Sequence, residues 1–138
     1  MNRKVFVDTN VFLDVVFSRH QPSAQFFQAA QEESVGLCLS LKTVMDFDYF
    51  VKDSFPKEQM KSMLSDLVTM HQLLPTTKQN VVDAISSRFS DFEDAVQHFT
   101  ALSEPGMEAI ITRNKRDYRN SRLPVYTPDE FVKQMKTQ

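Results

Sequence analysis

Short apolar runs alternate along the chain with longer stretches in which apolar residues recur every three or four positions. The short runs favour buried strands; they lie at 5–7, 35–39, 73–74, 109–111 and 125–126. The longer stretches have the spacing of amphipathic helices; they lie at 11–17, from 22, at 41–53, from 57 to 68, from 77, at 90–102 and from 128. Because strands connected through helices run parallel, this order predicts an α/β fold with helices on both faces of one sheet.

Two of the helix starts carry the pattern of a capping box, in which a Ser or Thr side chain and a Glu three positions later cap each other's backbone. The pattern occurs at 90–93 (SDFE) and at 127–130 (TPDE), and Pro128 suits the first position of a helix. We therefore expect helices to begin directly after Ser90 and Thr127.

The chain is long enough and apolar enough for one domain with a core of its own. It has 138 residues, of which 41% are apolar, including 12 Phe and 7 Met; a chain of this length buries roughly two-thirds of its unfolded surface. No repeat or linker divides it, so residues 1–138 are expected to form a single domain. Charged residues interrupt the apolar residues too often for a membrane span, and Asp8, Asn10 and Asp14 break the first apolar stretch, so the sequence predicts neither a membrane span nor a secretory signal. The predicted location is the cytoplasm.

Residue types that are scarce in this chain exclude several kinds of site. Cys38 is the only cysteine and the three histidines are scattered, so a disulfide framework and a cysteine zinc site are both excluded. Any metal must therefore be held mainly by oxygen. Only two glycines occur, which excludes the glycine-rich phosphate loops of many ATPases and dinucleotide-binding proteins.

Positive charge is concentrated in one part of a slightly acidic chain. The net charge is −2 and the pI is about 5.9, which argues against a generally basic nucleic-acid binder. Five cations nevertheless lie close together: Arg113, Lys115, Arg116, Arg119 and Arg122. Taken alone, such a stretch is more simply explained as a solvated loop.

Acidic and polar residues follow two of the predicted strands. Ligands of parallel α/β sheets bind outside the carboxyl ends of the strands. Residues 8–10 (DTN) follow the first strand and residues 112–117 (TRNKRD) follow the strand at 109–111, so both groups are placed for a site. The same residue types cap helices, so each group taken singly is explained about equally well as an N-cap.

Two of the predicted helices carry further acids. Asp91, Asp94 and His98 border the apolar stripe of the helix at 90–102, where a carboxylate can point into a cleft. Capping and the helix dipole offer a plainer explanation for the acids of its first turn. Asp46 and Asp48 lie among large apolar residues in the helix at 41–53, and we expect Asp48 rather than Asp46 to face solvent.

The order and spacing of these motifs resemble the PIN-domain nucleases, especially the toxins of bacterial toxin-antitoxin pairs, over residues 5–131. Residues 5–10 (VFVDTN) are similar to the family's opening strand and first acid, and residues 43–46 (TVMD) look like the helix that supplies the second acid. Residues 91–95 (DFEDA) are similar to the stretch with the third acid, and residues 111–118 (ITRNKRDY) look like the closing motif.

The resemblance implies a three-layer α/β/α sandwich around a five-stranded parallel sheet of order 3-2-1-4-5. This order reverses between the first strand and the strand at 109–111, so Asp8 and Asn114 are expected to face each other across one crevice. The implied activity is RNA cleavage by a water that Mg²⁺ or Mn²⁺ activates to attack the phosphodiester. The implied partners are the RNA substrate, a small antitoxin and a second copy of the chain.

The resemblance also implies roles for particular residues. The catalytic acids are Asp8, Asp46, Asp94 and Asp117. The metal ligands are Asp8, Asp94, Asn114 and Asp117, supported by Thr9, Asn10 and Thr112. The RNA backbone is bound by Arg113, Lys115, Arg116 and Arg119.

Two positions depart from the family pattern and keep alternatives open. The second acid is more usually Glu, which leaves Asp46 and Asp48 both as candidates, and many members have Asp where this chain has Asn114. A PIN fold that binds RNA or protein without cutting is therefore the main alternative.

Two other classes of protein fit the sequence less well. A phosphatase of the haloacid dehalogenase type needs a second Asp where Asn10 stands. A phospho-accepting receiver domain needs a strand that ends at an acid such as Asp53, whose neighbours do not read as a strand.

Overall fold

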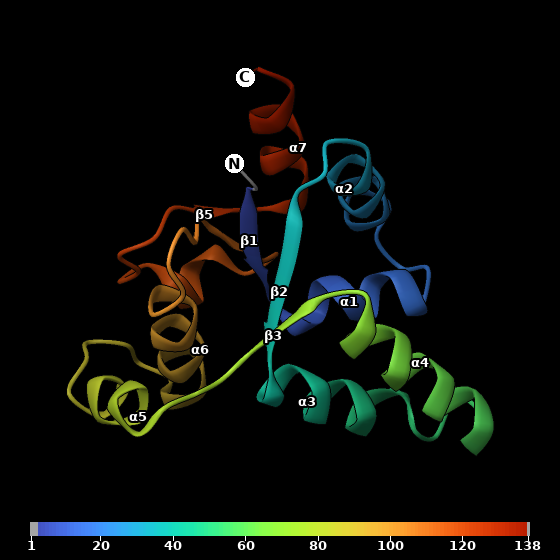
Figure 1. The fold of residues 1–138 in the computed structure, drawn as a ribbon, viewed down its shortest axis with the longest axis horizontal. Coiled ribbons are helices and arrows are strands. Elements are labelled where there is room, and N and C mark those ends of the chain that lie inside the picture. Colours follow the sequence, from blue (N-terminus) through green and yellow to red (C-terminus); the bar gives the residue numbers. More distant parts are fainter. Residues whose placement is uncertain (1–2, 138) are drawn as a thin grey trace.

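The computed structural model describes residues 3–137, and a five-stranded parallel sheet runs through its centre (Figure 1). The strands are β1 (Lys4–Val7), β2 (Gly36–Ser40), β3 (Gln72–Leu74), β4 (Ile110–Ile111) and β5 (Val125–Tyr126). Their order is β3-β2-β1-β4-β5, every neighbouring pair is parallel, and Val7 stands beside Ile111 where β1 meets β4. The predicted strand order and its reversal between β1 and β4 are confirmed.

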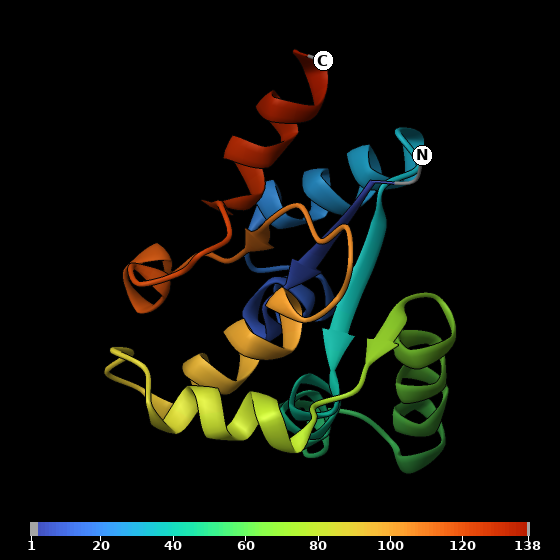
Figure 2. The ribbon, with the colours of Figure 1, turned by 60° about the vertical axis from the view of Figure 1, so that its left-hand side comes forward.

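Helices cover both faces of the sheet, which confirms the three layers (Figure 1). The helices are α1 (Thr9–Val16), α2 (Gln21–Glu32), α3 (Leu41–Val51), α4 (Lys57–Thr69), α5 (Lys78–Ile85), α6 (Phe92–Leu102), α7 (Pro128–Lys136) and the 3-10 helix η1 (Lys115–Tyr118). In Figure 1, α5 and α6 lie to the left of the sheet, and α1, α2 and α4 lie to its right. Figure 2 shows α5 packed alongside α6. None of the helices within residues 3–137 combines the length and the apolar character that crossing a membrane requires.

Alternation along β1 divides the core between the two helical layers. Val5 and Val7 belong to a cluster with Phe26 of α2 and Phe131 of α7. Phe6 points to the opposite face and packs in a second cluster, which contains Ala101 of α6. Val5, Phe6 and Val7 are all fully buried, which explains why a strand covered on both faces has an unbroken apolar run.

The helix caps show where the predicted boundaries shift. The expected capping box at Ser90 is wrong by one residue, because Asp91 is the cap and its carboxylate accepts the backbone N–H of Asp94 at 3.0 Å. A charged carboxylate is a stronger acceptor for the free N–H groups of a helix start than a hydroxyl is. The box at Thr127 is confirmed, with Glu130 as its second member.

Candidate active site

Asp8 stands at the carboxyl end of β1, beside the point where the strand order reverses. Its backbone N–H donates to the carbonyl oxygen of Ile111 at 2.9 Å, which ties it to the end of β4. One carboxylate oxygen caps α1 by accepting the Thr9 N–H at 3.0 Å, and the other accepts the Thr112 hydroxyl at 2.9 Å. Burial raises the pKa of Asp8, although both hydrogen bonds oppose the rise. Asp8 therefore caps a helix and also holds a carboxylate at the strand ends.

Thr112 connects Asp8 to the residues that follow β4. It is fully buried, and its hydroxyl oxygen also accepts the backbone N–H of Asn114 at 3.0 Å. Asn114 in turn donates through Nδ2 to the carboxylate of Asp117 in η1 at 2.7 Å. A chain of hydrogen bonds thus runs from the end of β1, past the end of β4, into η1.

Asp94 brings another acid to this place from the first turn of α6. Its pKa is raised to about 7, first by burial and then by the negative charges of Asp91, Asp117 and Asp8. These charges come from the end of β1, the start of α6 and η1, which are far apart in the sequence. The fold therefore brings Asp8, Asp94 and Asp117 within electrostatic reach of one another; we call these three residues the acid cluster.

Lys42 is a cation beside the acid cluster that sequence reasoning missed. It lies one turn before Asp46 on α3 and forms an ion pair with it, and its Nζ stands 3.9 Å from a carboxylate oxygen of Glu93. Its charge partly offsets the rise in pKa that burial causes at Asp8 and at Asp94. The i, i+4 spacing of Lys42 and Asp46 was the signal that could have found the pair.

The two candidates for the second acid differ in their surroundings. Asp46 has a side chain that is 31% exposed and lies against Lys42, whereas Asp48 is exposed. Beneath Asp46, the buried Gln97 of α6 donates to the Thr43 hydroxyl of α3 at 3.1 Å, which fixes the two helices relative to each other. The fold thus places Asp46, and not Asp48, next to the cation of this region.

Two buried hydroxyls near the acids have no hydrogen-bond partner among residues 3–137. Thr9 Oγ1 lies at the first residue of α1, followed by the exposed Asn10, and Tyr118 Oη lies at the end of η1. Burial raises the pKa of Tyr118 well above its usual value, and the charges of Asp8 and Asp94 raise it further, so Tyr118 stays a neutral donor. An unpaired buried hydroxyl costs free energy, and a water or ligand oxygen bound to either hydroxyl would remove that cost.

His98 lies elsewhere than the acids of α6, although the sequence places it on the same border of the helix. It is fully buried, and its Nε2 accepts the backbone N–H of Arg122 at 2.9 Å. Its ring packs against Phe89 and Phe99, with centroid distances of 4.9 and 4.6 Å. Sharing a border of the helix with Asp91 and Asp94 therefore does not place His98 in their site.

Two of the predicted RNA-binding cations already have acidic partners. Arg113 binds the buried Asp14 of α1, with its Nε 2.8 Å from Oδ2 of Asp14. The Nζ of Lys115 lies 3.1 Å from Oε1 of Glu130 in α7. Arg116 and Arg119 are exposed and form no ion pair within the described part of the chain. The positive charge that is free near the acid cluster therefore comes from Arg116 and Arg119.

The donor atoms of this region suit a hard divalent cation, although no three or more His, Cys, Asp or Glu side chains of residues 3–137 already have the spacing of a metal site. The donors are carboxylate, amide and hydroxyl oxygens, which Mg²⁺ and Mn²⁺ prefer. Burial and like charge both raise the pKa values of Asp8 and Asp94, and a bound cation offsets both effects. The residues fit such an ion once their side chains turn toward it.

A parallel sheet that reverses its order beside three carboxylates defines a three-layer α/β protein with an acidic, oxygen-rich site at its switch point. A family model described as PIN domain matches residues 4–116, more than half of the chain. The chain therefore belongs to the PIN-domain family, whose nucleases generally depend on divalent metal. This family is distinct from the haloacid dehalogenase phosphatases and the receiver domains. A comparison with curated protein sequences finds no match to the chain.

Solved structures with the same fold come from toxin-antitoxin complexes. A toxin-antitoxin complex from Klebsiella pneumoniae contains a chain with 23% identity and a TM-score of 0.66, over 90% of this chain and 97% of that one. VapBC2 from Rickettsia felis, bound to a promoter DNA fragment, gives 15% identity and a TM-score of 0.69 over 88% and 96%. DNA-bound VapBC from Salmonella typhimurium gives 16% identity and a TM-score of 0.67, over 93% of this chain and 99% of that one. At these identities the likeness is one of fold.

Proposed function

We propose that this chain is a metal-dependent endoribonuclease formed by a single PIN domain, and that it is the toxin of a toxin-antitoxin pair. The observation that carries the proposal is the gathering of the acid cluster at the reversal point of the sheet, where the charges of Asp8 and Asp117 bear on the pKa of Asp94. Membership of a nuclease family supports the reaction class. The toxin-antitoxin complexes that share the fold support the biological role.

In this proposal the acid cluster holds Mg²⁺ or Mn²⁺. Asp8, Asp94 and Asp117 provide carboxylate oxygens, and Asn114 provides its amide oxygen. A divalent ion bound there supplies Lewis acidity, which lowers the pKa of water and stabilises negative charge on phosphoryl oxygens. Water-derived oxygen bonds to phosphorus while the bond from phosphorus to the 3′-oxygen breaks, and the leaving oxygen takes up a proton.

Neighbouring residues hold the proposed ligands in place. The Thr112 hydroxyl donates to the carboxylate of Asp8, and its oxygen accepts the backbone N–H of Asn114. One side chain thus sets the positions of two proposed ligands. Thr9 and Asn10 form the first turn of α1 beside it. Asp46 is the proposed fourth acid. Its carboxylate forms an ion pair with Lys42, and in this proposal it leaves that ion pair and turns toward the metal site.

The proposed RNA contacts lie between β4 and β5, on η1 and on both sides of it. Arg116 and Arg119 are exposed and bind phosphates directly, while Lys115 exchanges its glutamate partner for the RNA backbone. Arg113 contributes from its ion pair with Asp14, which keeps the start of this segment against α1. The segment thus presents its cations directly after the strand end that carries Thr112.

The nature of the cleavage products tests the reaction directly. We expect wild-type protein with Mn²⁺ to cut a labelled single-stranded RNA into fragments with 5′-phosphate and 3′-hydroxyl ends, and EDTA to stop the reaction. Water is the nucleophile in this reaction, so the 2′-hydroxyl is not consumed. Mass spectrometry of the fragments checks this. Cyclic phosphate ends, or cutting that persists in EDTA, would contradict the mechanism.

The Asn114→Asp variant tests whether this residue faces the metal. Asn114 now donates to Asp117 at 2.7 Å, and an aspartate would place two carboxylates side by side. We expect Mn²⁺ to bind about tenfold more tightly, a gain of roughly 1.4 kcal/mol, and the metal-free variant to be less stable than wild type. Calorimetric titration measures the affinity, with Gln31→Glu, at an exposed position of α2, as the control that adds the same charge away from the site. Equal or weaker affinity in Asn114→Asp would mean that Asn114 does not face the metal.

A ridge of exposed apolar side chains on α3 supports a protein partner. Leu41, Met45 and Tyr49 recur one turn apart and are 58%, 62% and 65% exposed, and Phe92 of α6 is 52% exposed. Apolar side chains gathered at a surface in this way mark sites of protein association. The proposed partners are a small antitoxin, as in the complexes that share the fold, and a second copy of this chain.

The second candidate is a PIN fold that binds RNA or protein without cutting it. Asn114 stands where many members carry an acid, and Lys42 already neutralises Asp46. Both features weaken metal binding, because a hard cation gains affinity from each free carboxylate. The absence of cleavage with Mn²⁺ by a protein that still binds RNA would favour this candidate.

A further inference from the structure

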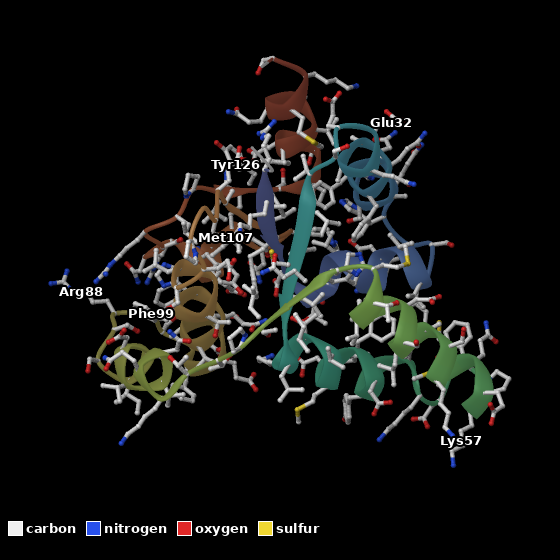
Figure 3. The ribbon with its side chains drawn as sticks, in the orientation of Figure 1. Glu32, Lys57, Arg88, Phe99, Met107 and Tyr126 are labelled. Atoms are coloured by element: carbon white, nitrogen blue, oxygen red, sulfur yellow. The ribbon has the colours of Figure 1, made fainter. Side chains whose placement is uncertain are left out.

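A cavity of about 480 Å³ lies beside α6, away from the acids of its first turn. Its wall combines aromatic and cationic side chains from three segments: Arg88 and Phe89 precede α6, His98 and Phe99 belong to it, and Arg122 follows η1. Figure 3 shows Arg88 on the left of the molecule, on the same side as Phe99 of α6. The volume lies within the range of small-molecule sites, roughly 300–1,000 Å³.

The walls of this cavity are fixed by hydrogen bonds between the segments. The backbone N–H of Arg122 donates to Nε2 of His98 at 2.9 Å, which attaches the segment after η1 to α6. The Nδ2 of Asn120 donates to the backbone carbonyl of Arg88 at 3.0 Å, which attaches the same segment to the loop before α6. The cavity is therefore a preformed feature of the fold.

His98 forms part of the wall of this cavity as a neutral, fully buried ring. Its Nε2 accepts a hydrogen bond, so in the neutral ring the proton is on Nδ1, and Nδ1 is buried without a partner among the described residues. Burial lowers the pKa of His98 to about 4, and the charge of Arg122 lowers it further, so the ring is neutral near pH 7. Because the ring is fully buried, His98 supports the wall and holds the backbone of Arg122 in place, and the exposed side chains of the wall are the ones that meet a ligand.

The remaining groups suit an aromatic anion. Phe89 packs edge to face with Phe99 at a centroid distance of 6.4 Å, and the guanidinium of Arg122 lies 5.8 Å from the Phe99 ring centre. Arg88 and Arg122 give the wall two positive charges against the single carboxylate of Asp83. Aromatic faces and guanidinium groups together bind the base and the phosphate of single-stranded nucleic acid.

The cavity is connected to the acid cluster through two aromatic rings. Phe89 contacts Tyr118 at a centroid distance of 6.3 Å, and Tyr118 is close enough to Asp8 and Asp94 for their charges to raise its pKa. His98 lies four residues after Asp94 on α6. On the surface, the exposed Arg119 and the cavity residue Arg122 lie on the same segment after η1, so a strand bound to these cations lies beside the cavity.

We propose that this cavity binds one nucleotide of the RNA strand outside the cleavage position, with its base against Phe89 and its phosphate between Arg88 and Arg122. The proposal rests on RNA being the substrate. The subsite favours single-stranded RNA, because a paired base must first break its pairing and stacking to enter a cavity.

The test measures binding without cleavage, using a fluorescein-labelled eight-nucleotide single-stranded RNA in EDTA. We expect Phe89→Leu, which keeps an apolar side chain but removes the stacking face, to weaken binding by about fivefold or more. The double variant Arg88→Met/Arg122→Met keeps the backbone contact to His98. It is expected to weaken binding at least about tenfold and to reduce the slope of log affinity against log salt by about 1.4, as two lost single-strand phosphate contacts require.

The matched control is Lys57→Met/Lys61→Met, which removes two charges from α4, on the opposite side of the molecule in Figure 3. It should bind the RNA within about twofold of wild type. Melting curves confirm that each variant is folded. If Phe89→Leu and the double arginine variant bind RNA as tightly as the control, the proposed subsite is wrong. This result would not affect the proposed nuclease function, which is tested separately by whether the wild type cleaves RNA.

A second readout follows the His98 ring itself. We expect the Nδ1 resonance of His98 in ¹H–¹⁵N spectra to shift when the RNA is added, and to shift less in the double arginine variant. A titration with 5′-AMP distinguishes a subsite for an RNA strand from a site for a free nucleotide. We expect 5′-AMP to bind much more weakly than the RNA, because a mononucleotide lacks the contacts that the rest of the strand makes. An unmoved His98 resonance, or mononucleotide binding as tight as that of the RNA, would overturn the proposal.

Discussion

Asp8→Asn and Asp94→Asn are each expected to lower Mn²⁺-dependent RNA cleavage by roughly 10²–10³-fold while the protein stays folded. The size is that of removing one preorganised charged group from a catalytic centre. Asparagine keeps the shape of each side chain and an oxygen that can accept a hydrogen bond. In Asp8→Asn the amide oxygen can keep the cap on α1, and the amide NH₂ can donate to the Thr112 hydroxyl, which turns its own proton away. Cleavage rates with saturating Mn²⁺ and circular dichroism spectra check the two parts of this prediction.

The stability of metal-free Asp94→Asn gives a second, independent measurement. Burial and the surrounding carboxylates raise the pKa of Asp94 to about 7, above its value of about 3.9 in an unfolded chain. The folded state therefore holds the proton more tightly, and Asp94 lowers stability progressively as pH rises from about 4 to about 7. We expect Asp94→Asn to be more stable than wild type at pH 8, by on the order of 1 kcal/mol after allowance for solvent screening, and no more stable at pH 4.

Asp48→Asn is the matched control for both variants, because Asp48 is an exposed acid on the same helix as Asp46. It should leave the cleavage rate and the pH dependence of stability unchanged. If Asp8→Asn or Asp94→Asn retains full activity, that residue does not belong to the catalytic site. If Asp94→Asn is no more stable at pH 8 than wild type, the carboxylates do not repel one another in the folded protein.

Asp14→Asn is expected to destabilise the protein by about 2–3 kcal/mol at pH 7. The side chain of Asp14 is fully buried and accepts hydrogen bonds from Ser23 at 2.6 Å, from Arg19 at 2.8 Å and from Arg113 at 2.9 Å. An amide removes the charge and turns one acceptor into a donor that faces other donors. The loss stays below the roughly 3–5 kcal/mol of a wholly buried pair, because the side chains of Arg19 and Arg113 are 41% and 37% exposed.

The pH dependence identifies the charge as the cause. Burial alone would raise the pKa of Asp14, but the hydrogen bonds from Arg19 and Ser23 and the charge of Arg113 lower it overall. Its stabilising contribution is therefore complete above the unfolded value of about 3.9 and is lost as pH falls through the lower folded value. Urea unfolding at several pH values measures this, with the exposed Asp53→Asn as control. A difference between Asp14→Asn and wild type that does not shrink in acid would assign the loss to packing.

The alternation of strands and helices was readable from the sequence because it depends on local periodicity. An unbroken apolar run such as Val5 to Val7 indicates a strand buried on both faces, and connections through helices require that strands run parallel. The strand order came from the resemblance to PIN domains rather than from the pattern. The polar residues after β1 and β4 were placed for a site by the general rule for parallel sheets, which needs only the strand ends.

The contacts between charged residues were decided by the tertiary structure alone. Periodicity places Arg113 in a loop and Asp14 on a helix, but only the packing of α1 against the segment after β4 makes them partners 99 positions apart. His98 shares a border with Asp94 on α6, yet the loops that fold over that helix bury the histidine and leave the acid near the other carboxylates. A sequence pattern reports which residues share one face of an element. What covers that face depends on segments distant in the chain, whose packing is set by the whole core.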